Sequence, residues 1–130
     1  MRLKRLVCLA AAILLMLTSC GGKIMELTYK QISQEEAKKM MDQYADAIIL
    51  DVREAEEFAA GHIKGAVLLS VGSITEESAA EVIGEKDTMV LIYCRSGNRS
   101  KTASAKLAAL GYSNVYEFGG INTWPYEIEK

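Results

Sequence analysis

The strongest constraint on the fold is a cysteine placed between an apolar segment and a helix-forming one. The apolar run 88–93 ends directly before Cys94, and the polar stretch 95–100 leads into residues 101–110, which are rich in alanine and leucine. This order predicts a buried strand, a short loop and a helix. Backbone N–H groups and the helix dipole at such a junction stabilise an anion, so Cys94 is well placed to act as a thiolate.

Strand-like and helix-like segments alternate along the rest of the chain. Apolar segments predict strands at 26–32, 47–52, 66–70, 88–93 and 114–118. Amphipathic segments predict helices after Ser33, where Glu36 completes a capping-box pattern, over 54–60 and 74–83, and after Ser100. Continuous rather than alternating apolar strands indicate a parallel sheet buried on both faces, hence an α/β fold in three layers. In such sheets ligands bind beyond the carboxyl ends of strands, where Cys94 lies.

Charge is unevenly distributed around Cys94. The chain has a formal net charge of −2, yet residues 88–116 contain no acidic residue and four basic ones. A local positive field of this kind favours an anionic substrate. Lys101 and Lys106 belong to the predicted helix, and Lys106 has a simpler interpretation as part of its solvated face. Arg95 and Arg99 flank Gly97 in a loop too short to hide them.

The first 19 residues have the three zones of a signal peptide. Three basic residues stand among the first five, and 12 apolar residues follow at 6–17, too few to span a bilayer. The segment ends in Leu17-Thr18-Ser19-Cys20, which resembles a bacterial lipobox. That resemblance implies cleavage before Cys20 and attachment of a diacylglyceryl group to its thiol. The alternative is an uncleaved or conventionally secreted terminus with an incidental cysteine.

These features predict three parts: a lipoprotein signal peptide at 1–19, a lipidated tether at 20–26 and one domain at 27–130. The product would be exported and held at the cell membrane or outer membrane through Cys20. Loss of the three basic residues takes the net charge from −2 to −5, and such an acidic domain is not expected to bind nucleic acid. Cys94 is then the only free thiol, because Cys8 leaves with the signal. Its presence indicates chemistry, the alternative being an inert buried cysteine.

Four segments of the predicted domain resemble, in order and spacing, the signature stretches of single-domain rhodaneses, a family of sulfurtransferases. The segments are Leu50-Asp51-Val52-Arg53-Glu54, Glu57-Phe58 with Gly61-His62-Ile63-Lys64-Gly65-Ala66, the loop Cys94 to Ser100, and Gly119-Gly120-Ile121-Asn122-Thr123-Trp124. The resemblance covers nearly the whole domain. It implies a rhodanese-like fold, a three-layer α/β domain whose five-stranded, mainly parallel sheet is flanked by helices.

The resemblance also implies sulfur transfer in two steps. The Cys94 thiolate would take the outer sulfur of an anionic donor such as thiosulfate, and the persulfide would pass it to cyanide or a thiol. The implied substrate-binding residues are those of the loop: Arg95, Ser96, Gly97, Asn98, Arg99 and Ser100. Arginine suits the donor's oxyanion, Gly97 permits a tight turn, and Ser100 either offers its hydroxyl to the sulfur or caps the helix. No cofactor and no metal is implied, and we expect a monomer.

Three further polar residues, Asp51, Arg53 and His62, have both a pocket and a structural interpretation. Asp51 and Arg53 could line the site from a neighbouring strand end, or pair with each other and the backbone, which we favour. His62 is the only histidine, but an already formed thiolate needs no general base, and its glycine-flanked turn indicates a structural role. Trp124 is expected to anchor the core.

Two departures from the two-domain thiosulfate enzymes of the family leave the donor open. Those enzymes tend to have a basic residue just before the aromatic of the second signature, where this chain has Glu57 before Phe58. They also have a lysine at the third loop position, which is Ser96 here.

Other uses of the same loop remain as alternatives. A phosphatase or arsenate reductase typically places its arginine six positions after the cysteine, where this chain has Ser100, with Arg99 one residue earlier. The shorter spacing favours a single sulfur atom over a phosphoryl group. A non-catalytic sulfur carrier or binding module is compatible with the same loop. Thiol redox sensing would need a resolving thiol from another molecule.

Overall fold

The computed structural model describes residues 28–130, and the predicted signal peptide, Cys20 and tether lie outside the described residues. The elements are β1 (Lys30–Gln31), α2 (Gln34–Gln43), β2 (Ile48–Asp51), α3 (Ala55–Ala60), β3 (His62–Ile63), β4 (Val67–Leu68), a 3₁₀ turn (Val71–Ser73), α4 (Glu76–Val82), β5 (Val90–Cys94), α5 (Asn98–Ala109), β6 (Val115–Gly120), a second 3₁₀ turn (Ile121–Thr123) and β7 (Ile128–Glu129). No helix within residues 28–130 is long and apolar enough to cross a membrane.

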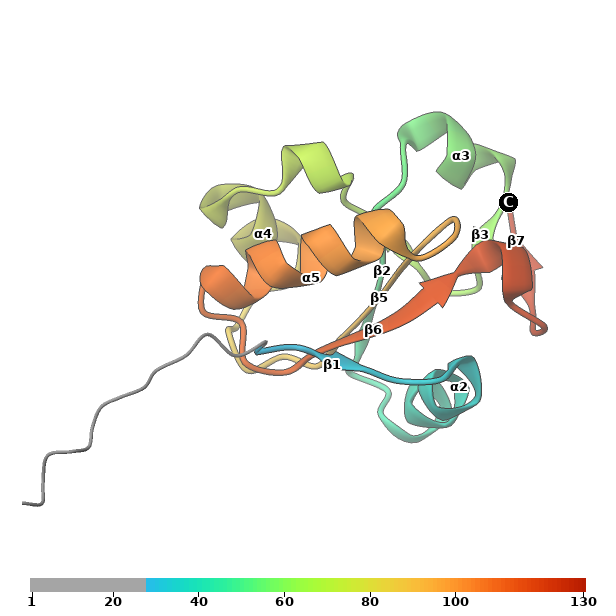
Figure 1. Ribbon diagram of the computed structural model, residues 1–130, viewed down its shortest axis with the longest axis horizontal. Coiled ribbons are helices and arrows are strands. Elements are labelled where there is room, and N and C mark those ends of the chain that lie inside the picture. The colour runs from blue at the N-terminus through green and yellow to red at the C-terminus, as the bar shows by residue number, and fades with distance from the viewer. Residues whose placement is uncertain (1–27) are drawn as a thin grey trace, which may run out of the picture.

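A five-stranded sheet with the order β1-β6-β5-β2-β4 forms the middle layer (Figure 1). Every neighbouring pair in it is parallel, as the sequence predicts. β5 occupies the centre, and all five of its residues are buried. Because parallel strands all end at one edge, the carboxyl ends of β5, β2 and β6 bring Cys94, Asp51 and Gly120 to the same side of the domain.

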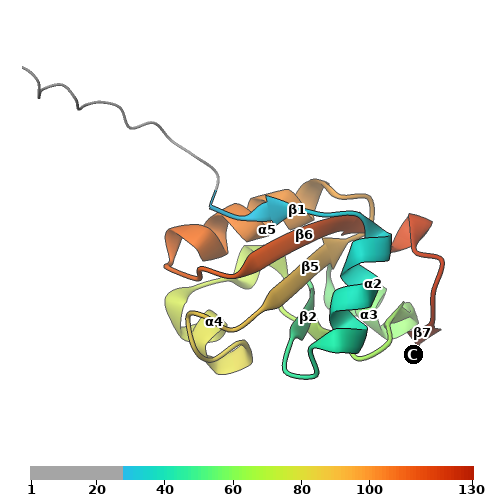
Figure 2. The same cartoon turned by 90° about the horizontal axis from the view of Figure 1, so that it is seen from below.

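Helices cover both faces of the sheet, so the domain has the three predicted layers (Figures 1 and 2). Alternate residues of β5 divide between the two faces: Val90 and Ile92 join the core with α4 and α5, whereas Leu91 and Tyr93 join the core with α2. Each fully buried side chain of this size contributes about 1.5–3 kcal/mol relative to an exposed one. A strand that serves two cores has no polar face, which explains its continuous apolar sequence.

The helix starts follow local capping signals. Ser33 is the N-cap of α2, and its Oγ accepts a hydrogen bond from the Glu36 N–H at 3.0 Å. Glu54 precedes α3, and its N–H donates to the Glu57 carboxylate at 2.9 Å. The predicted helix starts are therefore confirmed for these two helices within two residues.

The sequence pattern does not predict a second, smaller sheet. β3 and β7 pair antiparallel in a second, two-stranded sheet. Each strand has only two residues, so neither offers the run of alternating or apolar residues that identifies a strand in a sequence. The pairing ties residues 128–129 to the segment that follows α3.

Candidate active site

The loop after β5 is shorter than the sequence indicates. Cys94 is the last residue of β5 and Asn98 the first of α5, with Gly97 as N-cap at a φ of +110°. Glycine reaches this left-handed conformation without a steric penalty from a Cβ. The prediction of a helix beginning after Ser100 is wrong by three residues, because the polar segment 98–100 forms the first helical turn. Ser100 lies inside that turn and does not cap the helix.

Two glycines at the end of β6 hold the loop in place. A Cβ at Gly120 would lie 1.9 Å from the carbonyl oxygen of Arg95, and one at Gly97 would lie 3.5 Å from the Cα of Gly119. The same Arg95 carbonyl accepts a hydrogen bond from the Asn122 N–H at 3.2 Å. The signature segment 119–124 therefore acts as the support against which the Cys94 loop rests, and only glycine fits at position 120.

Cys94 lies at the bottom of the loop with 1% of its surface exposed. The Gly97 N–H donates to Sγ at 3.0 Å, and Sγ lies 3.5 Å from the Ser100 hydroxyl oxygen. Burial disfavours the thiolate, but hydrogen bonds from the Ser100 hydroxyl and from the N–H groups of Ser100, Gly97 and Ser96 outweigh it. The pKa of the Cys94 thiol is therefore lowered.

Arg99 is engaged by a partner outside the loop. Its guanidinium donates two hydrogen bonds to the Glu57 carboxylate of α3, at 2.8 and 3.0 Å. The Arg99 hydrogen bonds lower the pKa of Glu57 to about 2, and Glu57 in turn raises the pKa of Arg99. The positive field expected from the sequence is thus partly balanced by an acidic residue from a distant segment, which a linear charge count cannot reveal.

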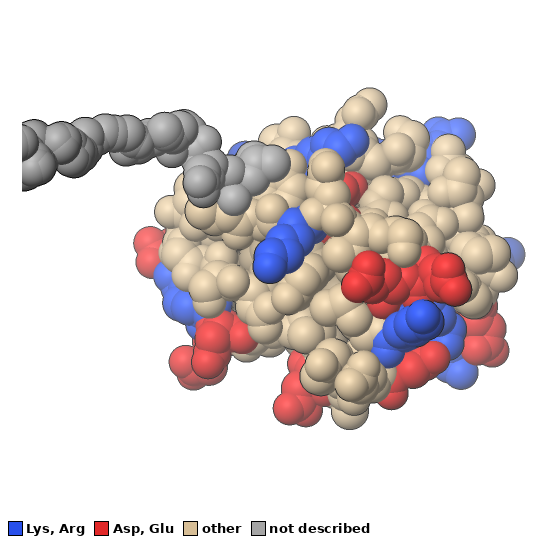
Figure 3. All heavy atoms as spheres, turned by 60° about the horizontal axis from the view of Figure 1, so that its bottom comes forward, with Lys and Arg blue, Asp and Glu red and all other residues tan. Residues whose placement is uncertain are grey.

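Three of the other loop residues face solvent. Arg95, Ser96 and Asn98 are exposed, whereas Gly97 and Ser100 are buried. Arg95 is consequently the loop arginine with freedom to meet a ligand arriving from outside. Elsewhere acidic and basic side chains are interspersed, and on the face drawn in Figure 3 the described residues form no continuous basic patch.

Glu117 is the site residue that the sequence analysis missed. It sits in β6 with 3% of its surface exposed, and its Oε2 accepts hydrogen bonds from Ser100 Oγ at 2.5 Å and from the Gly119 N–H at 3.0 Å. Ser100 therefore touches both Cys94 and Glu117. An acidic residue within the otherwise buried strand 115–118 was the available signal, because a buried carboxylate requires a specific partner.

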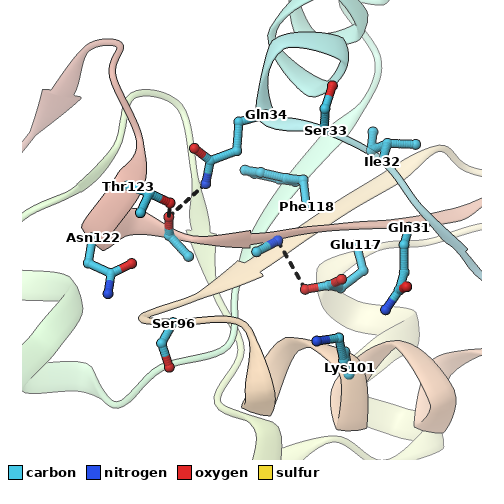
Figure 4. A pocket seen from close by; sticks show the side chains of 12 residues that line it. Gln31, Ile32, Ser33, Gln34, Ser96, Lys101, Glu117, Phe118, Asn122 and Thr123 are labelled. Atoms are coloured by element: carbon cyan, nitrogen blue, oxygen red, sulfur yellow. Dashed lines mark hydrogen bonds between the residues drawn. The ribbon is translucent and has the colours of Figure 1, made fainter.

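A pocket of about 500 Å³ opens beside this support, between β1, β6 and the start of α5. Figure 4 shows Glu117 below β6 with Gln31 and Lys101 around it, and Ser96 and Asn122 at the other end. Cys94 does not line this pocket. The pocket flanks the loop through Ser96.

Asp51 and Arg53 form a closed network at the end of the neighbouring strand. Arg53 donates from Nε and Nη2 to the Asp51 carboxylate at 2.7–3.1 Å and from Nη2 to the Gly61 carbonyl at 2.7 Å. The Tyr93 hydroxyl donates to Asp51 as well. Asp51 is fully buried and Arg53 is 5% exposed. These contacts fit the structural interpretation, since both carboxylate oxygens of Asp51 and the Nε and Nη2 groups of Arg53 are bonded within the network.

His62 likewise faces structural partners. Its ring stacks on Phe58 with centroids 3.8 Å apart, and Nδ1 lies 2.9 Å from the Phe58 carbonyl oxygen. Nε2 lies 3.5 Å from Glu129. Trp124 packs against Phe118 and Tyr126, in keeping with an anchoring role. No cluster that could hold a metal ion occurs among residues 28–130.

An α/β domain with a buried, acidified thiol at the start of a helix is thus the class that fold and site define. Comparison with known sequences places it further: the sequence model of the "Rhodanese-like domain" matches residues 33–126. The chain therefore belongs to the rhodanese-like domain family, and the resemblance found in its motifs is confirmed.

Individual relatives agree with this family. The chain is 36% identical over 99 residues to "Thiosulfate sulfurtransferase GlpE" of Pseudomonas entomophila, covering 74% of this chain and 84% of that protein. It is 34% identical over 99 residues to the protein of the same name from Coxiella burnetii, covering 75% and 89%. Among solved structures it resembles the "rhodanese with anions from E. coli", with a TM-score of 0.60 and 27% identity over 65% of this chain and 98% of that one. The BH2092 protein of Bacillus halodurans gives a TM-score of 0.67 at 27% identity, covering 79% and 77%.

Proposed function

We propose that the protein is a sulfurtransferase that carries sulfane sulfur as a persulfide on Cys94. The observation that carries this proposal is the thiol's setting: Sγ is buried, faces the Gly97 N–H and Ser100 hydroxyl, and has a lowered pKa. The names of the GlpE relatives support the reaction class. Their substrate, thiosulfate, is one candidate donor for this chain.

In the first step the Cys94 thiolate attacks the outer sulfur of the donor. With thiosulfate, an S–S bond to Cys94 forms, the donor's own S–S bond breaks, and its electron pair leaves on sulfite. The negative charge passes to the terminal sulfur of the persulfide. N–H groups of the loop and the start of α5 then stabilise that charge, as they stabilise the thiolate.

In the second step a thiophilic acceptor removes the terminal sulfur. Cyanide attacks it, the persulfide S–S bond breaks, and the electron pair returns to Cys94 as the thiolate. A thiol acceptor would react in the same sense and leave as its own persulfide. The exposed Arg95 is placed to attract an anionic donor, while Arg99 remains tied to Glu57.

A phosphatase or arsenate reductase is the less favoured alternative. Phosphoryl transfer needs donors around three equatorial oxygens, but the loop has only three residues between Cys94 and Asn98, and Arg99 is held by Glu57. A cradle of this size suits one sulfur atom. Release of phosphate from an aryl phosphate at a rate abolished by Cys94→Ala would reverse this preference.

Intact mass spectrometry after incubation with thiosulfate tests the sulfur-transfer proposal. We expect a mass gain of one sulfur atom that disappears on addition of cyanide and is absent in Cys94→Ser. Other sulfane donors, such as a small-molecule persulfide, are tested in parallel because the donor is open. Absence of the adduct with every donor would leave the non-catalytic binding module as the better interpretation.

We further propose the lipoprotein organisation: a signal peptide at 1–19, a tether at 20–26 starting at lipidated Cys20, and the domain at 27–130 as a monomer on an extracytoplasmic membrane surface. The basic, apolar and lipobox zones of the sequence support it. Fractionation of cells expressing the full chain is the test. The wild-type protein should sediment with membranes and carry a lipid label. Cys20→Ala should not carry the lipid label. Equal lipid labelling of both would contradict the proposal.

A further inference from the structure

Glu117 presents a problem that sulfur transfer alone does not explain. The Glu117 carboxylate is 3% exposed, and a single residue, Ser100, contacts both it and the Cys94 thiol. That thiol must become an anion to react. Two negative charges this close in a buried site repel each other, and each raises the cost of the other. A sequence selected only for an acidic thiol would place an uncharged side chain at position 117.

The single proton of the Ser100 hydroxyl sharpens the problem. In the structure the thiol donates to Ser100 Oγ, and Ser100 donates to Glu117 Oε2. The thiolate needs the opposite arrangement, in which Ser100 donates to Sγ. Ser100 cannot donate to both anions at once, so the thiolate form is fully hydrogen-bonded only when Glu117 carries a proton and donates it to Ser100.

We propose that Cys94 and Glu117 share one proton through Ser100. When the thiolate forms, the Cys94 S–H bond breaks and its proton joins Ser100 Oγ, while the former hydroxyl proton of Ser100 passes to Glu117 Oε2. No proton enters or leaves the protein and the net charge of the three groups is unchanged. The role of Glu117 rests on the proposed function, since it acts through Ser100 on the sulfur that reacts.

Other charged groups around the pair are few. On α5, Lys101 lines the same pocket as Glu117, and no hydrogen bond joins the two. Arg99 interacts electrostatically with Cys94, but Glu57 balances its charge. On the neighbouring strands the residues paired with Glu117 are Gln31 and Ile92, which are uncharged. Among the described residues, Ser100 is therefore the side chain that hydrogen-bonds to both Cys94 and Glu117.

The rate of Cys94 alkylation by iodoacetamide as a function of pH tests the coupling. A shared proton predicts two steps in the wild type, separated by a plateau in which the thiolate fraction is independent of pH. In Glu117→Gln the competing charge is gone, so the profile becomes a single step at lower pH. Within the plateau range only part of the wild-type protein holds the proton away from Cys94, so the variant should react faster, by about twofold when the proton is shared equally.

The matched control is Glu85→Gln, the same change at an exposed position, which should retain the two steps. A single step in the wild type, or a Glu117→Gln profile with the wild-type midpoints, would overturn the proposal and leave Glu117 a structural role. Alkylation requires no sulfur donor, so this result is independent of the sulfur-transfer test.

A measurement on the wild type keeps the proposal falsifiable if Glu117→Gln does not fold. The infrared difference spectrum between free and alkylated protein in the plateau range should show loss of a protonated carboxyl band, because alkylated Cys94 no longer takes or gives a proton. Absence of any such band would contradict the shared proton.

Discussion

Two neighbouring strands of the sheet end at the same edge and carry charged or ionisable groups there, yet the two ends have opposite character. At the end of β2, Asp51 and Arg53 satisfy each other with the help of Tyr93 and Gly61. At the end of β5, Cys94 faces donors that can stabilise an anion and a hydroxyl whose proton can point either way. Both strand ends lie at the carboxyl edge of the sheet. Only the end of β5 leaves groups available for chemistry.

The comparison separates stability from reactivity. A closed buried network contributes to the fold and is costly to break because a lone charge remains. A poised thiol contributes little to folding, and its hydrogen bonds act on the charge state of sulfur. Substitutions at the β2 end should therefore change unfolding, and those at the β5 end should change rates.

Asp51→Asn should have the largest effect on stability. It removes one partner of a fully buried pair and leaves the Arg53 guanidinium uncompensated, so we expect the free energy of unfolding to fall by about 3–5 kcal/mol. Urea denaturation measures it. Asp42→Asn is the control, since its partner Lys38 is on the surface. Equal losses in the two variants would break the assignment of the β2 end as structural.

Gly120→Ala should impair both stability and transfer. The new methyl group meets the Arg95 carbonyl at 1.9 Å, so the loop must shift, at a cost of about 1–3 kcal/mol typical of overpacking. Gly72→Ala has nothing within 4 Å and serves as the control. A Gly120→Ala protein with wild-type alkylation and sulfur loading would show that the support from β6 is unnecessary.

Ser100→Ala should slow reactions of the thiol, measured under conditions in which the variant is folded. The Ser100 hydroxyl lowers the pKa of Cys94, so its loss raises that pKa and reduces the thiolate fraction at neutral pH, by roughly tenfold for one pKa unit. Ser104→Ala is the control, because Ser104 is buried on the same helix with an unpaired hydroxyl. Similar alkylation rates in both variants would remove Ser100 from the site.

Glu57→Gln should produce the smallest effect, visible only in acid. The pKa of Glu57 is lowered to about 2 from 4.5, so the Arg99 pair stabilises the fold above pH 4.5 and this contribution is lost as pH falls toward 2. Both side chains are about one-third exposed, and the contribution is expected below about 1 kcal/mol. The stability difference between wild type and Glu57→Gln should therefore shrink over that range, while Glu56→Gln shows no such trend.

The sequence was sufficient for what depends on local pattern or on a contiguous motif. Apolar continuity predicted the buried β5, and the Cys94 loop was recognised from adjacent residues. It was insufficient where contacts join distant segments: the Glu57–Arg99 pair spans 42 positions and the Ser100–Glu117 contact spans 17. The start of α5 was misplaced because the left-handed Gly97 can begin a helix within a segment that resembles a loop.

The most direct test compares the two strand ends in one experiment. Wild type, Asp51→Asn and Cys94→Ser are incubated with a sulfane donor under conditions in which all are folded, and the intact masses are recorded over time. We expect wild type and Asp51→Asn to gain one sulfur atom and Cys94→Ser to gain none. A sulfur adduct on Cys94→Ser, or no adduct on the wild type with any donor, would contradict the role assigned to Cys94.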